Sequence, residues 1–296
     1  MTTMSSPRVT VIMATYNWST VLPYSIASVL GQTFGDFELL VVGDGCTDDS
    51  EAVVGAIEDP RVRWISIPRT GHQSGPNNEG LRQARGEIIA YLGHDDLWLP
   101  HHLVQHVAAI EGGHDFTYSL AAFVGPESAF IECARPDPVR GFWMIPSGLA
   151  HLRAMTEEVG GWRDFRELTI SPEGDLILRA LAAGKRYAHV PRLTVVKFPA
   201  AWRRNVYRER PFHEQAAWTH RIRTEPDLEA VLLGNLVAYP SPNRTSVASR
   251  LWRLLRQPWR WLPRLRPSKG SNLRAWQRFK GVDHAHGSKE RQSIGE

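Results

Sequence analysis

The chain has 296 residues, 42% hydrophobic and 22% charged, which is typical of one large globular domain or a domain and a half. Two cysteines, Cys46 and Cys133, argue against a disulfide framework or a cysteine-rich metal site and favour a reducing compartment. The net charge of +4 is uneven, because residues 245–280 hold ten Lys or Arg and no Asp or Glu, which leaves −6 elsewhere. We therefore expect no nucleic-acid binding by the main domain.

Strand and helix patterns alternate through the first hundred residues. Strands are predicted at residues 9–14, 37–42, 62–67 and 87–92, and helices at residues 19–32, 47–57, 78–84 and 100–110. Ser19 or Thr20 is the expected cap of the first helix. The alternation predicts a Rossmann-like α/β fold, a mostly parallel sheet flanked by helices, whose loops gather at one edge to form a site.

The middle of the chain is less regular. A strand is predicted at 116–124, a helix at 149–159, and a second helix at 173–183 that begins after Ser171 and Pro172. No run approaches the ~18 apolar residues of a membrane span, and the short polar start predicts no signal peptide. A cytoplasmic location follows, with the inner face of the membrane as the alternative.

An acidic pair follows the fourth predicted strand, in the run Gly93-His94-Asp95-Asp96. Hard cations such as Mg²⁺ or Mn²⁺ prefer oxygen ligands and bridge readily to phosphate oxygens. The carboxyl ends of strands are also where open α/β sheets bind ligands. Taken alone, the pair is weak evidence for a metal site, because an Asp-Asp pair is more often a solvated turn or a helix cap.

Three segments together resemble the GT-A glycosyltransferases of family 2. They are residues 9–17 (VTVIMATYN), 32–48 (QTFGDFELLVVGDGCTD) and 86–100 (GEIIAYLGHDDLWLP), and the resemblance extends over about residues 8–200. It implies a GT-A fold, a nucleoside diphosphate sugar as donor, most often UDP-linked, transfer to a hydroxyl with inversion, and Mn²⁺ or Mg²⁺ as cofactor.

The resemblance also implies roles for the donor site. Tyr16, beside the backbone of Ala14, would stack on the base, because an aromatic face suits a flat ring. Asp44 would accept a hydrogen bond from the base. Asp96 would bind the metal, and Asp95 would reach the ribose, or the metal through water.

Some positions depart from the family pattern. Gly43 replaces an Asp, Asn77 replaces an Arg, and His94 stands at the usual first Asp position of the acidic motif. Arg69 and His72 are candidates to replace the contact of the missing Arg.

An inverting transfer needs a general base that takes the proton of the acceptor hydroxyl. The family places an acid at a helix start, six residues before an Arg and after a Gly-Gly-aromatic run. Here Gly160-Gly161-Trp162 precedes Glu173, which lies six residues before Arg179, and Asp175, which lies four before it. We favour Glu173 as the general base and keep Asp175 as the alternative. If neither is catalytic, both carboxylates are there because acidic residues stabilise a helix N-terminus.

The chain is expected to divide into a catalytic core at 1–200, an acceptor-side part at 201–244 and a basic, Trp-rich tail at 245–296. The tail interleaves Trp and Leu with Arg at 251–256 and 259–262, which suits an interfacial helix on anionic lipid or a solvated tail. His213 is a further candidate metal ligand.

The predicted function is metal-assisted transfer of a sugar to a saccharide or lipid-linked acceptor, in surface polysaccharide or glycolipid synthesis. A catalytically inactive nucleotide-sugar-binding protein is the main alternative. A nucleotidyltransferase is another, although residues 14–17 lack its Gly-rich basic signature.

Overall fold

The computed structural model describes residues 6–125, 129–132, 144–203 and 205–238. The basic tail lies outside these residues, so both expectations for it stay predictions. Among the described residues, no helix has the length and apolar character needed to cross a bilayer.

The first four strands form a parallel sheet, as the alternating pattern predicts. They are β1 (Val9–Thr15), β2 (Phe37–Asp44), β3 (Val62–Ile67) and β4 (Ile88–Tyr91), in the spatial order β3-β2-β1-β4. The helices between them are α1 (Leu22–Leu30), α2 (Ser50–Gly55) and α3 (Ser74–Gln83). β1 and β2 are buried on both faces, which explains why each reads as a near-continuous apolar run.

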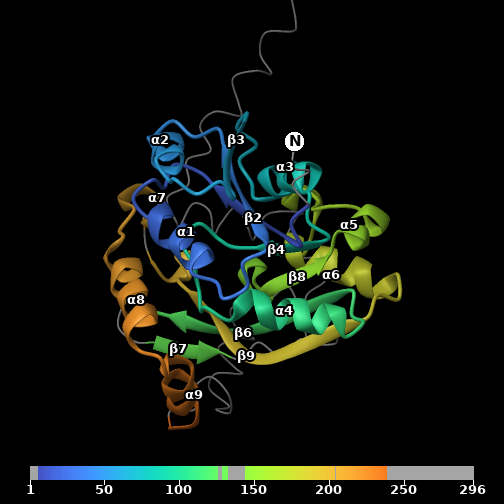
Figure 1. Ribbon diagram of the computed structural model, residues 1–296. Coiled ribbons are helices and arrows are strands. Elements are labelled where there is room, and N and C mark those ends of the chain that lie inside the picture. Colours follow the sequence, from blue (N-terminus) through green and yellow to red (C-terminus); the bar gives the residue numbers. More distant parts are fainter. Residues whose placement is uncertain (1–5, 126–128, 133–143, 204, 239–296) are drawn as a thin grey trace, which may run out of the picture.

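Beyond β4 the sheet becomes mixed. The order continues through β8 (Leu149–Leu152), β6 (Phe116–Val124), β9 (Tyr187–Lys197) and β5 (Leu97–Trp98), with β7 (Ala129–Glu132) beside β6. β8 runs antiparallel to both β4 and β6, whereas β6 and β9 are parallel. Both halves of the described chain thus share one sheet, and the predicted α/β fold is confirmed (Figure 1).

The second half also supplies helices and short turns. The helices are α4 (His102–Glu111), α5 (Arg153–Val159), α6 (Pro172–Ala182), α7 (Val206–Glu209), α8 (His213–Thr224) and α9 (Leu228–Ala238). The 3-10 turns are η1 (Pro146–Gly148), η2 (Phe165–Glu167) and η3 (Ala200–Trp202). In Figure 1, α7 and α8 lie together on the left side of the molecule.

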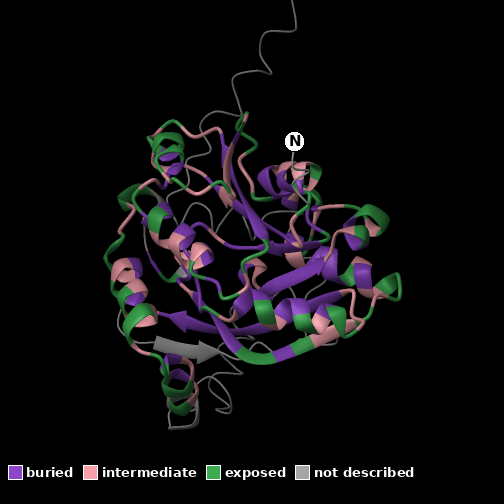
Figure 2. Ribbon diagram, viewed as in Figure 1, coloured by how far each residue is buried: buried purple, intermediate pink, exposed green. Residues whose placement is uncertain are grey.

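Hydrophobic side chains pack on both faces of the sheet. Val11 and Met13 of β1 belong to a cluster with residues of α1 and α4, whereas Ile12 belongs to one with residues of α5 and α6. This division follows from the alternation of side chains along a strand. A third cluster joins Trp218 of α8 and Leu228 of α9 to the far end of the sheet. Buried strands therefore run between partly exposed helices (Figure 2).

One predicted helix is wrong over its first turn. Residues 149–152 form β8, and only the continuation, α5, is helical. The reason is tertiary, because these residues fill the gap between β4 and β6 and pair with both.

The expected cap of the first helix is also wrong. α1 begins at Leu22, and its N-cap, Val21, makes no side-chain capping bond. The start of α6 is as predicted, since Ser171 accepts a hydrogen bond from the Gly174 N–H and Pro172 opens the helix.

Candidate functional site

The acidic pair lies between β4 and β5, but its two carboxylates have different surroundings. Asp96 is fully buried and is satisfied by protein donors. Ser147 donates its hydroxyl to Oδ2, Lys197 Nζ lies 2.9 Å from the same oxygen, and the Phe198 N–H donates to Oδ1 at 3.3 Å. Burial raises the pKa of Asp96, and the Lys197 ammonium opposes that rise. Asp96 therefore acts first as an internal anchor.

Asp95 has fewer partners within the protein. Its carboxylate lies 3.9 Å from Lys197 Nζ, and its backbone carbonyl accepts a 3.2 Å bond from Gln215 of α8. An ideal Cβ on Gly93 would lie 2.9 Å from Oδ2 of Asp96 and 3.2 Å from Oδ1 of Asp95. The two carboxylates thus flank Gly93, where any side chain would crowd them.

This donor set fits a hard cation at Asp95 better than at Asp96. Such a cation commonly takes one or two carboxylates and completes its shell with substrate phosphates and water. The oxygens of Asp96 are already taken by Ser147, Lys197 and the backbone of Phe198. The described residues contain no group of three or more His, Cys, Asp or Glu side chains placed to hold a metal alone.

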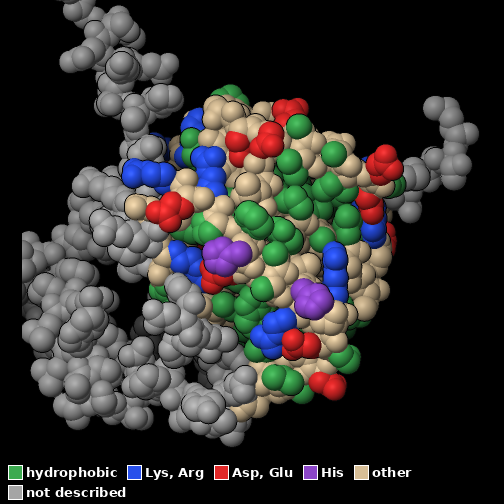
Figure 3. All heavy atoms as spheres, turned by 90° about the vertical axis from the view of Figure 1, so that its left-hand side faces the viewer, with side chains coloured by type: hydrophobic (Ala, Val, Ile, Leu, Met, Phe, Trp, Pro, Cys, Tyr) green, Lys and Arg blue, Asp and Glu red, His purple; other side chains and the backbone are tan. Residues whose placement is uncertain are grey.

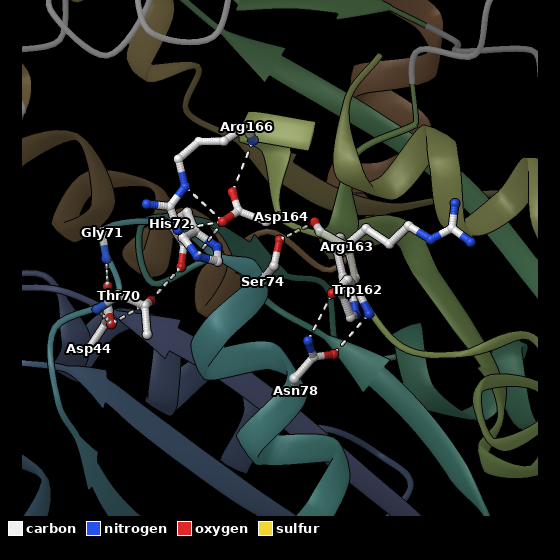
Figure 4. Close-up of polar contacts among 10 residues, drawn as sticks. All are labelled: Asp44, Thr70, Gly71, His72, Ser74, Asn78, Trp162, Arg163, Asp164 and Arg166. Carbon is white, nitrogen blue, oxygen red and sulfur yellow. Dashed lines mark hydrogen bonds and ion pairs between the residues drawn. The ribbon is translucent and has the colours of Figure 1, made fainter. Parts of the chain in front are cut away.

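Asp44 lies at the end of β2 and is 3% exposed. Oδ1 accepts bonds from the Thr70 N–H at 2.6 Å and from the Thr70 hydroxyl at 2.7 Å. Oδ2 accepts a 3.0 Å bond from the Gly71 N–H (Figure 4). The same oxygen pairs with Arg69. Asp44 therefore organises the loop after β3, and a base bond to it would add to, or replace, one of these contacts.

The ring of Tyr16 lies just after β1, and the Arg69 guanidinium covers one of its faces. The distance from Arg69 Cζ to the ring centre is 3.4 Å. Asn17, the next residue, has a left-handed φ of 49° and binds the β2 loop through its side chain, which accepts from Thr47 N–H at 2.6 Å. Tyr16 and Ala14 are each half-buried at this edge. The predicted base-stacking residue is thus brought next to Asp44.

Two of the three departures from the family motifs, Gly43 and Asn77, have a physical basis. A Cβ on Gly43 would overlap the indole ring of Trp64 on β3, so the space of the missing Asp is filled by that ring. Asn77 is 4% exposed within α3 and packs in the interior.

Glu173 and Asp175 sit on the first turn of α6 but are not equivalent. Asp175 accepts a 2.8 Å bond from Arg179 Nε, and Arg179 also binds the carbonyl of Gly161 at 2.7 Å. Glu173 is half-buried and accepts a 3.2 Å bond from Gln73, and loss of solvent raises its pKa, which hydrogen bonds from Gln73, Ser171 and its own backbone oppose. Asp175 thus serves the local structure, and Glu173 keeps a carboxylate that can exchange protons.

The base candidate and the acidic pair share one environment. The charges of Glu173, Lys197 and Asp96 all act on the phenol of Tyr118, whose pKa is raised chiefly by burial. Lys197 also lowers the pKa of Glu173. The fold thus brings together residues that lie about a hundred positions apart in the sequence.

Helix α3 and the loop before it are joined to the segment after Gly161, as Figure 4 shows. Asn78 donates to the Trp162 carbonyl at 2.8 Å and accepts from the Trp162 N–H at 2.8 Å. Ser74 donates to the Arg163 carbonyl at 2.8 Å. His72 Nε2 lies 3.6 Å from an Asp164 oxygen, and burial lowers the pKa of His72. This bridge links the donor-side loop to the helix that carries Glu173.

Sequence reasoning missed Lys197, Ser147 and Gln215. Each lies outside any recognisable motif, and only the tertiary fold brings β9, η1 and α8 to the acidic pair. Trp162 is 3% exposed and packs against Tyr91. His213 is exposed at the start of α8.

Comparisons with known proteins show which family and fold this chain resembles. The family model "Glycosyl transferase family 2" matches residues 10–146. The glucosyltransferase WfgD of Escherichia coli, named for UDP-Glc and a GlcNAc-diphosphoundecaprenol, is 33% identical over 137 residues, which are 46% of this chain and 54% of WfgD. The chain spans about half the length of the curated relatives it matches.

Solved structures share the fold at low identity. TarS of S. aureus in complex with UDP-GlcNAc matches with a TM-score of 0.56 and 16% identity over 82% of this chain and 77% of TarS. The mannosyltransferase PcManGT of Pyrobaculum calidifontis, in complex with GDP-Man and Mn²⁺, matches with a TM-score of 0.52 and 18% identity over 94% and 87%. The chain has a GT-A fold, and its residues 10–146 match the glycosyl transferase family 2 domain.

Proposed function

We propose that this protein transfers a sugar from a nucleoside diphosphate sugar to an acceptor hydroxyl, with inversion at the anomeric carbon. The observation that carries the proposal is the position of Glu173, a carboxyl with a raised pKa whose charge is coupled to Lys197 beside the acidic pair. A transferase of this class needs a base and a diphosphate-binding group within one site, and these residues meet that need.

Tyr16, Asp44 and Asp95 form the proposed donor side. UDP is the favoured nucleotide because WfgD and TarS are described with UDP-linked sugars. The base would stack on Tyr16, and the Asp44 loop would contact its edge. Arg69 contacts both Tyr16 and Asp44, so a nucleotide bound there would lie next to its guanidinium.

Glu173 is the proposed general base. It would take the proton of the acceptor hydroxyl as that oxygen attacks the anomeric carbon and the bond to the diphosphate breaks. A raised pKa suits this role, because a base whose pKa lies nearer the working pH accepts a proton more readily. Asp175 is the weaker candidate, since its carboxylate is already bound to Arg179.

Mn²⁺ or Mg²⁺ is the proposed cofactor, and Asp95 is the residue we propose to hold it. When bound, such a cation neutralises charge that builds up on the leaving diphosphate. Asp96, the ligand expected from the motif, would instead fix the loop through Ser147 and Lys197.

The acceptor we propose is lipid-linked, as the name of WfgD indicates for that relative. Hydrophobic side chains gather across the side of the molecule that carries α7 and α8 (Figure 3). Phe212 and Trp202 are exposed hydrophobic residues near these helices in the sequence, at 49% and 38%. Residues 201–244 would then form the acceptor side, and the basic tail would contact the membrane.

The test is a donor screen with the matched variants Glu173→Gln and Glu167→Gln. Wild type should hydrolyse or transfer from one of UDP-Glc, UDP-GlcNAc or GDP-Man. Glu173→Gln should lose about 10²–10⁴ of that rate, the usual contribution of general base catalysis, while keeping donor affinity. The control Glu167→Gln, which changes an exposed residue, should leave the rate at the wild-type value. Donor binding without turnover in the wild type would instead indicate an inactive binding protein.

A further inference from the structure

We propose that Lys197 acts as an internal cation that competes with the divalent ion at the acidic pair, so that the ion binds tightly only together with the donor. This inference rests on the proposed function for the identity of the site. It concerns a positioning residue outside any of the recognised motifs.

The first support is geometric. Lys197 is the last residue of β9, and its ammonium lies between the two carboxylates, 2.9 Å from Asp96 and 3.9 Å from Asp95. The Lys197 side chain is 21% exposed, so its ammonium group lies at the border of the site rather than deep in the core. A cation at Asp95 would therefore meet a fixed like charge close by.

The second support is the count of available ligands. Asp96 is held by Ser147, Lys197 and the Phe198 backbone, which leaves Asp95, whose side chain is 10% exposed, as the carboxylate with fewer protein partners. A single carboxylate beside an ammonium is a weak site for a hard cation. A diphosphate changes this balance, because its oxygens complete the shell and its negative charge offsets both cations.

Ion and donor should therefore bind with positive coupling, and by reciprocity each raises the affinity of the other. Without the ammonium, Asp95 and Asp96 could both attract the ion, so the ion would bind alone. A purely structural Lys197 would leave affinity for the ion in the absence of nucleotide unchanged.

The experiment is a titration of the full chain with Mn²⁺, in which free Mn²⁺ is followed by electron paramagnetic resonance with and without UDP. Lys197→Met should bind Mn²⁺ alone at least tenfold more tightly than wild type. It should also show a smaller gain in Mn²⁺ affinity when UDP is added. Lys197→Arg, which keeps the charge, should behave as wild type. Equal or weaker Mn²⁺ binding by Lys197→Met would overturn the proposal.

A second pair of variants guards against misfolding, because Lys197→Met leaves the buried Asp96 without its counter-ion. Asp96→Asn and Asp96→Asn/Lys197→Met differ only in the ammonium, and the double variant should again bind Mn²⁺ more tightly. No difference within this pair would also sink the idea. If UDP binds to none of these proteins, the proposed function is contradicted. The Mn²⁺ affinities measured without UDP would still decide the role of Lys197.

Discussion

Arg69 lies over Tyr16, with its guanidinium carbon 3.4 Å from the centre of the ring. The same guanidinium pairs with Asp44, so one side chain joins the loops after β1, β2 and β3. A nucleobase that stacks on Tyr16 must use the opposite face or displace Arg69. The proposed donor site is thus covered on one face of Tyr16 by the protein's own cation.

Tyr16→Ala should weaken UDP binding, because it removes the stacking surface. Base–aromatic stacking is worth about 1–3 kcal/mol by alanine substitution, which corresponds to a loss of roughly 5- to 150-fold in affinity. Tyr16→Phe keeps the ring and should bind as wild type. Isothermal titration calorimetry with UDP measures both, and unchanged affinity in Tyr16→Ala would show that the base lies elsewhere.

Restoring the family's Asp with Gly43→Asp should destabilise the protein, because the Trp64 ring fills that space. Overpacking of this kind costs typically about 1–3 kcal/mol. The cost should fall when Trp64 is also replaced by Leu, since the smaller side chain makes room. A double-mutant cycle by urea denaturation checks the coupling, and additive effects would contradict it.

Glu173→Gln and Asp175→Asn should differ in their effect on the free energy of unfolding. Burial raises the pKa of Glu173 above its unfolded value, so its charged form costs stability once the pH rises through that range. Glu173→Gln should therefore be as stable as wild type, or more stable, at pH 7.5. Asp175→Asn removes the charge paired with Arg179 and should cost about 1–3 kcal/mol. Thermal melts of the two variants decide this, and equal losses would argue against separate roles.

Buried histidines predict loss of stability in mild acid. Burial lowers the pKa of His106 to about 3 and that of His151 to about 4, and it holds the pKa of His102 well below its usual value. The rings make polar contacts as neutral groups, for example His106 with the Thr117 hydroxyl at 2.7 Å. Since the unfolded chain binds protons near pH 6.5 and the folded protein does not, stability falls as the pH drops below 6.5.

Each such histidine should remove about 1.4 kcal/mol per pH unit below the unfolded pKa. Urea denaturation at pH 7.5, 6.0 and 5.0 measures the slope. His106→Asn removes one of these titrating groups and should reduce the slope by the contribution of one histidine, about 1.4 kcal/mol per pH unit. A midpoint that does not change from pH 7.5 to pH 5.0 would refute the neutral buried state.

Much of the first hundred residues can be predicted from sequence, because the patterns that mark their strands and helices are local. β1, β2, β3 and β4 each read as apolar runs, and the residues that end them, such as Asp44 and Asp95, reach one edge by the rules of parallel sheets. The start of α6 follows from its cap at Ser171, whereas the role predicted for Glu173 comes from the family resemblance.

The rest depends on contacts between distant segments. β8 was predicted as helix because four residues carry little periodic signal, and its neighbours β4 and β6 decide its state. The different surroundings of Asp95 and Asp96 come from Ser147 and Lys197, which lie 51 and 101 positions from Asp96. No spacing rule links such residues before the sheet order is known.

The antiparallel pairing of β8 with β4 bears on how this protein can be divided. The segment that matches the family, residues 10–146, ends just before β8, so a fragment cut there would leave β4 with an open edge. Unpaired strand edges invite association with other chains. Such a fragment would also lack Glu173 and Lys197. The smallest piece that can be produced and studied on its own must therefore extend at least through β9.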